Sequence, residues 1–169
     1  MIRPILKFGD ATLHHSAALV SEITPEIETL IRDLAETMYA APGIGLAAPQ
    51  VGVPLRAFVI DLSRGRSSDG LIALLNPEFV ERDGMQLEEE GCLSLPGFNA
   101  TVARPLRARI KGIDLTGAER VIQGEGLLAR AFQHEMDHLE GKVFVDRLRG
   151  IKRDLIVRRI RKQIRSGQW

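Results

Sequence analysis

The features that usually direct a protein out of the cytoplasm are missing from this 169-residue chain. It has a single cysteine, which excludes an internal disulfide and is typical of proteins in a reducing compartment. No apolar run approaches the ~20 residues that a membrane-spanning helix needs, and the segment from Met1 to Lys7 becomes polar too soon for a signal peptide. We therefore expect a cytoplasmic protein without membrane contact.

The chain also has almost no net charge, because it contains 23 basic and 22 acidic side chains. This balance conceals an asymmetry, since the segment from Lys142 to the C-terminus has ten Lys and Arg against two Asp and Glu. Within it, Ile156, Ile160 and Ile164 recur every four residues among basic side chains, which predicts an amphipathic helix at about residues 150–166. A basic face suggests an anionic partner, although an ordinary solvated helix would look the same.

The remaining pattern predicts one α+β domain spanning residues 1–169, without repeats or low-complexity segments. Thr24-Pro25-Glu26 is a typical helix start, and Ala41-Pro42-Gly43 should end that helix. Short, mostly antiparallel strands are expected to pack around a central helix, without a βαβ rhythm. We expect them at about residues 55–61, 71–75, 79–81 and 102–113, the last broken near Arg104-Pro105, with a hairpin turn at 114–117.

The most specific motif is His134-Glu135-Met136-Asp137-His138, inside a helical pattern from about Glu125 to Glu140. Residues four apart lie on one face of a helix, so His134 and His138 can offer two imidazole nitrogens to one cation. Glu135 lies one step around the helix, where it can act as a general base on water. The central helix is therefore expected to bind a metal.

A catalytic metal of this kind normally has a third protein ligand. Metalloproteases often supply a histidine downstream, but Phe144 occupies that position here. A lone cysteine is more often a small buried hydrophobe than a ligand. Cys92, however, lies between a glycine and Leu93-Ser94 and not in an apolar run, so its thiolate is a candidate to complete the site.

Gly43-Ile44-Gly45-Leu46-Ala47-Ala48-Pro49-Gln50 is a stretch of small residues ending in an amide. Its glycines allow a close approach of the backbone, either to another element or to a ligand. Gln50 could direct its amide at an oxygen atom.

Taken with Glu90-Gly91-Cys92-Leu93-Ser94 and with Gln133 to Leu139, this stretch resembles the three motifs of the peptide deformylase family, in the same order. The resemblance covers nearly the whole chain. It implies a hydrolase of protein biosynthesis that removes the formyl group from the N-terminal formylmethionine of new polypeptides. Its partners would be N-formylmethionyl peptides and nascent chains.

The resemblance also implies roles for single residues. Cys92, His134 and His138 would hold one divalent metal ion, with Fe²⁺ favoured and Zn²⁺, Ni²⁺ or Co²⁺ as alternatives. A water on this ion would attack the formyl carbon with Glu135 as general base. Gln50 and the Leu93 N–H would stabilise the oxyanion.

Substrate contacts follow from the same resemblance. The residues that would line the methionine pocket or pair with the peptide are Ile44, Gly45, Gly91, Leu127 and Ala131. Glu90 and Arg104 are expected to form a supporting ion pair. Asn99 and Glu88 differ from some relatives, which carry an Arg and an apolar residue there, and this leaves the peptide preference open.

Two other functions are compatible with parts of the sequence. One is a metal-dependent peptidase or amidase that uses the His-Glu-x-x-His motif with another third ligand. The other is a non-catalytic module that binds the ribosome or RNA through the basic C-terminal helix. Trp169 is the only aromatic residue in that helix region, so base stacking is not supported and no specific DNA binding is expected.

Overall fold

The computed structural model describes all of residues 1–169 and has the predicted α+β architecture. A five-stranded antiparallel sheet has the strand order β1-β2-β3-β6-β7. Its members are β1 (Gly45–Ala47), β2 (Ala57–Ile60), β3 (Ile72–Asp83), β6 (Arg107–Ile113) and β7 (Glu119–Glu125). A separate antiparallel pair consists of β4 (Gln86–Gly91) and β5 (Asn99–Arg104).

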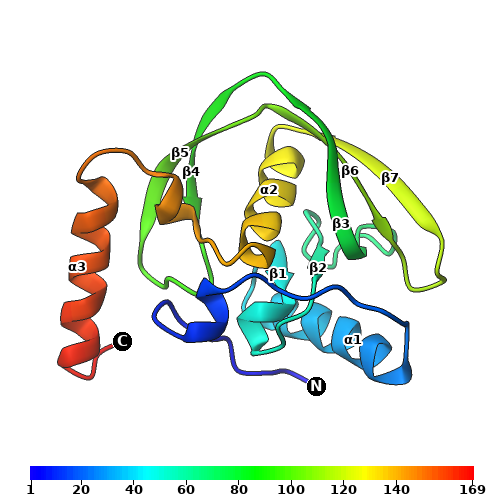
Figure 1. The fold of residues 1–169 in the computed structure, drawn as a ribbon, viewed down its shortest axis with the longest axis horizontal. Coiled ribbons are helices and arrows are strands. Elements are labelled where there is room, and N and C mark those ends of the chain that lie inside the picture. The colour runs from blue at the N-terminus through cyan, green and yellow to red at the C-terminus, as the bar shows by residue number, and fades with distance from the viewer.

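Three α-helices and three short 3-10 helices complete the fold. They are α1 (Pro25–Ala40), α2 (Leu127–Leu139), α3 (Lys152–Arg165), η1 (Ala11–His14), η2 (Ala48–Val51) and η3 (Phe144–Arg147). Figure 1 shows α2 in the middle of the molecule, with β3, β6 and β7 on one side and β4 and β5 on the other. The central helix expected from the sequence is thus confirmed.

The apolar face of α2 fixes its position. Phe132, Met136 and Leu139 are buried against side chains of the large sheet, including Phe58 and Ile110. Burial of this face removes large apolar surfaces from water, which is the main favourable term in folding. The opposite face of the same helix is left to carry polar chemistry.

Local signals determine several boundaries. The Thr24 hydroxyl accepts a hydrogen bond from the Ile27 N–H at 3.3 Å, and Pro25 occupies the first turn of α1. These contacts satisfy a free N–H group and lose no helical hydrogen bond. The predicted break near Arg104-Pro105 is also confirmed, because β5 and β6 on either side of it belong to different sheets.

Two strands, β1 and β4, were not expected from the sequence, and a third, β3, is longer than expected. Residues 71–75 and 79–81 were expected as separate strands, but both belong to β3, which has a register shift between Leu75 and Glu78. Asn76 adopts a φ of 50° at this irregularity. Its side chain accepts a hydrogen bond from the Val20 N–H and donates one to the Val20 carbonyl, both at 2.8 Å. A distant segment therefore stabilises the bulge.

The predicted C-terminal helix is present as α3. Val157 and Ile160 are buried, and Ile160 packs with Leu95, Phe98 and Phe144. The basic side chains at the other positions of α3 face solvent for the most part. No helix in the structure combines the length and the apolar character needed to cross a bilayer.

Candidate metal centre

The polar face of α2 carries His134 and His138 one turn apart, as the spacing predicts. The strand β4 ends at Gly91, and the next residue, Cys92, meets this face. The Cys92 Sγ lies 3.4 Å from His138 Nε2, and one ligand atom from each of the three residues lies within 4.8 Å of the others. Sequence-distant groups therefore converge on one point, where a small cation could be held.

A buried network of charges orients His134. Its Nδ1 lies 2.8 Å from Glu90 Oε1, so Nε2 is the nitrogen left for a cation. Glu90 also accepts hydrogen bonds from Arg104 Nε at 2.6 Å and Nη2 at 2.9 Å, and from Arg130. The expected ion pair of Glu90 with Arg104 is confirmed. Burial alone would raise the pKa of Glu90, but the bonds from His134 and Arg104 hold it at about 2.

Glu135 points into the space next to these groups and is only 3% exposed. Burial raises the pKa of this carboxyl to about 7. The backbone of β1 passes so close that a Cβ atom on Gly45 would lie 2.5 Å from Glu135 Oε1. The glycine is thus required for the close approach, which is one of the two alternatives that the sequence left open.

Gln50 lies on η2 and is almost completely buried. Its Oε1 accepts a hydrogen bond from the Ala47 N–H at 2.9 Å, which fixes the amide orientation. Its Nε2 donates to Ser94 Oγ at 3.1 Å and lies 3.8 Å from Cys92 Sγ. The N–H of Leu93 makes no hydrogen bond within the chain. Two donors therefore lie next to the cysteine.

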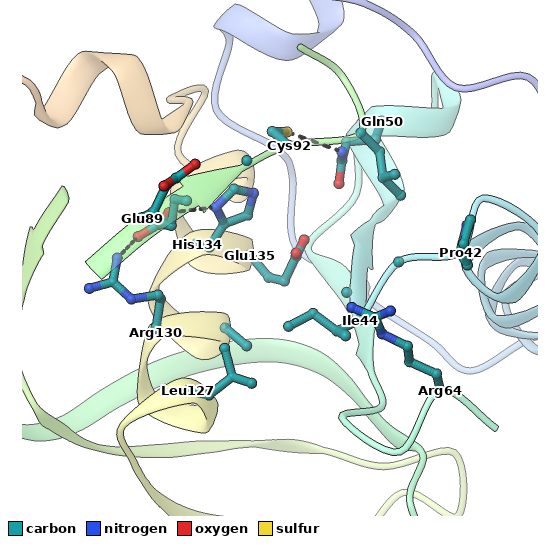
Figure 2. A pocket seen from close by; sticks show the side chains of 16 residues that line it. Pro42, Ile44, Gln50, Arg64, Glu89, Cys92, Leu127, Arg130, His134 and Glu135 are labelled. Atoms are coloured by element: carbon teal, nitrogen blue, oxygen red, sulfur yellow. Dashed lines mark hydrogen bonds and ion pairs between the residues drawn. The ribbon is translucent and has the colours of Figure 1, made fainter. Parts of the chain in front are cut away.

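A cavity of about 400 Å³ opens in front of these groups. Its wall includes every residue to which the motif resemblance assigned a role in catalysis or substrate contact, and two of the three candidate ligands (Figure 2). These residues are Ile44, Gly45, Gln50, Gly91, Cys92, Leu93, Leu127, Ala131, His134 and Glu135. His138 lies behind the wall and is 1% exposed. The size is in the usual range for small-molecule sites.

The donor set fits a cation. Cys92 Sγ and His138 Nε2 lie 3.4 Å apart, and the third candidate ligand, His134, keeps Nε2 free because its Nδ1 is bonded to Glu90. Burial lowers the pKa of His138 well below its ordinary value, whereas burial of His134 is outweighed by its bonds with Cys92 and Glu90, which raise its pKa, so a cation must displace a proton from His134. One thiolate and two imidazoles suit Fe²⁺, Zn²⁺, Ni²⁺ or Co²⁺.

Some residues of the site were not identified from the sequence. Arg130 precedes His134 by four residues on the same helix face, and this spacing could have indicated it. Asp137 accepts hydrogen bonds from Arg104 at 3.0 Å and from Arg147 at 2.5 Å, and so extends the network around Glu90. Arg64 lines the cavity from an irregular loop, and no sequence pattern in that loop predicts this position.

Comparisons with known proteins agree with this geometry. A family model described as "Polypeptide deformylase" matches residues 2–154. A peptide deformylase of Acidobacterium capsulatum is 49% identical over 169 residues, which cover 100% of this chain and 99% of the relative. The crystal structure of a peptide deformylase from Legionella pneumophila superimposes with a TM-score of 0.91 at 44% identity, covering 99% and 98% of the two chains. A peptide deformylase from Synechococcus elongatus in complex with actinonin gives a TM-score of 0.88 at 38% identity, covering 95% and 90%.

Proposed function

The chain belongs to the polypeptide deformylase family, a family of metal-dependent enzymes that remove the formyl group from N-terminal formylmethionine, and from this premise we propose a role for each side chain of the centre. Cys92, His134 and His138 hold the metal ion. The observation that carries this assignment is the convergence of their ligand atoms to within 4.8 Å of one another. When bound, the cation supplies Lewis acidity toward the formyl oxygen and toward water.

Glu135 serves as the general base and acid. Burial disfavours the charged form of this carboxyl, so it can accept a proton and then return it. Its position beside the candidate ligands allows it to take the proton of the attacking water and pass it to the departing amine. Glu90 acts by orienting His134 through Nδ1.

Gln50 and Leu93 stabilise the charge that develops on the formyl oxygen. The Gln50 amide is fixed by its bonds with Ala47 and Ser94 and keeps a second N–H to donate, and the Leu93 N–H has no partner within the chain and is free to donate. Loss of one donor of this kind typically lowers the rate by about 100- to 1000-fold. Ile44, Leu127 and Ala131 form the apolar part of the wall against which the methionine side chain packs.

The test of this assignment is Glu135→Gln, measured in two ways. Turnover of a formyl-Met peptide should fall by a factor of at least about 100, because the amide cannot accept the proton. The metal content should equal that of wild type, since Glu135 is not a ligand. Loss of the metal, or near-normal turnover, would show that Glu135 has another role.

We also propose that the resident metal is Fe²⁺. Ligand type alone does not select it over Ni²⁺ or Co²⁺. Metal analysis of protein purified without oxygen should find iron. The iron form should lose activity in air faster than protein reloaded with nickel or cobalt, because a thiolate ligand beside ferrous iron is readily oxidised. Another metal in place of iron in that analysis would contradict the assignment, and equal lifetimes in air would contradict the oxidation of the thiolate ligand.

A second proposal concerns α3, whose basic face would bring the enzyme to nascent chains by docking on the RNA-rich surface of the ribosome. Arg153, Arg158, Arg161 and Arg165 line one depression of about 410 Å³, in which Asp154 is the only acid. Such a surface attracts phosphate groups in a salt-dependent way.

Reversal of Arg158, Arg161 and Arg165 to Glu should weaken co-sedimentation with ribosomes and leave turnover of short peptides unchanged. The matched control reverses Arg32, Arg66 and Arg120, three exposed basic residues on other elements. Equal co-sedimentation of the α3 variant and wild type would leave α3 with only a packing role.

A further inference from the structure

The mouth of the catalytic cavity carries two charged side chains that nothing in the protein neutralises. Arg64 and Glu89 both line the cavity and both are exposed. Neither side chain takes part in an ion pair or a hydrogen bond within the chain, whereas Arg130 in the same wall is buried and paired with Glu90. Figure 2 shows Arg64 and Glu89 on opposite sides of the cavity, with Glu135 between them.

The loop that presents Arg64 is anchored from inside the protein. The Asp61 carboxylate is completely buried and accepts hydrogen bonds from the Ser63 N–H and hydroxyl at 2.9 and 2.6 Å. It also accepts one from the Gly65 N–H at 3.1 Å and one from the Tyr39 hydroxyl at 2.6 Å. The residues on both sides of Arg64 are therefore tied to the same carboxylate.

This anchoring decides where the guanidinium group can reach. Arg64 itself adopts a φ of 55°, in the left-handed region, as the loop turns back toward the cavity. Arg66, two positions later, donates instead to the Ser63 carbonyl at 3.0 Å and does not line the cavity. The loop thus directs one of its two nearby arginines toward the substrate and keeps the other occupied.

Substrate must pass this mouth. Given the proposed function, the formyl group reaches Glu135 and the candidate ligands at the closed end, so the residues that follow methionine leave the cavity between its exposed walls. We propose that Arg64 is a specificity-determining residue, which favours substrates with an acidic side chain at one of the two positions that follow the formylmethionine. Glu89 lies on the opposite wall beside Glu88 and Arg130, of which Arg130 is already paired with Glu90, so Glu89 opposes the effect of Arg64 on side chains that reach that wall.

Two sets of formyl-Met peptides test this inference. In the first set the second residue of the peptide is Glu, Gln or Lys, and in the second set the third residue is varied in the same way. All other residues are neutral. In one of the two sets, wild type should turn over the Glu peptide with a kcat/KM about two- to fivefold above that of the Lys peptide, as expected for one exposed ion pair. The difference should lie in KM, since a charge at the mouth acts on binding, and it should shrink as salt rises.

Variants assign the effect to one residue. Arg64→Gln should remove the preference and Arg64→Glu should reverse it, with the Gln peptide as the neutral reference for both ratios. Arg66→Gln, in the same loop, is the matched control and should keep the wild-type ratio. Glu89→Gln should strengthen the preference for acidic peptides.

Three results would overturn the inference. They are an unchanged Glu-to-Lys ratio in Arg64→Gln, an equal change in Arg66→Gln, and a wild-type preference for Lys that Glu89→Gln abolishes. A failure of the proposed catalytic roles would be distinguishable, because it would appear as normal turnover of all peptides by Glu135→Gln, whatever the charge ratio.

Discussion

Replacement of Glu90 by Gln changes one charge at the centre of the buried network and leaves the side-chain volume almost unchanged. The carboxylate is 5% exposed and accepts four hydrogen bonds, two from Arg104, one from Arg130 and one from His134. An amide has one oxygen to accept these bonds. Its NH2 group must face a nitrogen donor, so at least one donor loses its partner.

The expected loss of stability depends on which arginine loses its carboxylate partner. Removal of one partner of a buried ion pair costs about 3–5 kcal/mol. Arg104 keeps a bond to Asp137 at 3.0 Å, whereas Arg130 retains only an amide oxygen and a main-chain carbonyl. We therefore expect the free energy of unfolding to fall by about 3 kcal/mol, at the lower end of that range. For a domain of this size, Tm should fall by roughly 6–12 °C.

Urea denaturation of metal-free protein measures this difference without a contribution from metal binding. Glu89→Gln is the matched control, because the neighbouring carboxylate on β4 is exposed and forms no ion pair, and it should change stability by less than about 0.5 kcal/mol. Metal affinity of Glu90→Gln should also fall by about 10- to 100-fold, since His134 loses the bond that orients it. A stability loss no larger than that of the control would refute the reasoning.

Three further predictions follow from single contacts. Gly45→Ala should lower turnover by at least about tenfold with the fold and metal content retained, because the new Cβ displaces the Glu135 carboxylate; wild-type turnover would show that this carboxylate can relax. Cys92→Ser should lose metal to a chelator more readily than wild type and lose activity with it, since a serine hydroxyl is a poor ligand, and retention of both would favour a hydrolase with another third ligand. Tyr39 is the only tyrosine, so phenolate absorbance reports it alone, and its midpoint should lie near pH 12 because burial and the bond to Asp61 raise its pKa. Because the pKa is raised in the folded state, it stabilises the fold below pH 10, and this contribution should fade between pH 10 and 12 in wild type but not in Tyr39→Phe. A titration midpoint near pH 10 would contradict the bond to Asp61.

Local spacing was sufficient where a regular element sets the geometry. His134, Glu135 and His138 take their relative positions from the helical repeat of α2, so their shared face could be predicted before any tertiary contact was known. Thr24-Pro25 and Arg104-Pro105 likewise mark boundaries through hydrogen bonding and steric effects that act within a few residues.

The tertiary structure decided everything that depends on which distant segments meet. Cys92 reaches His138 across 46 positions of the chain, and Glu90 joins His134 to two arginines from different elements. Asn76 stabilises a bulge through Val20, which no local pattern encodes. Arg64 lines the cavity because the buried Asp61 holds its loop. Side-chain identity limits what a residue can do, but its partners depend on how apolar faces pack, and packing is a property of the whole chain.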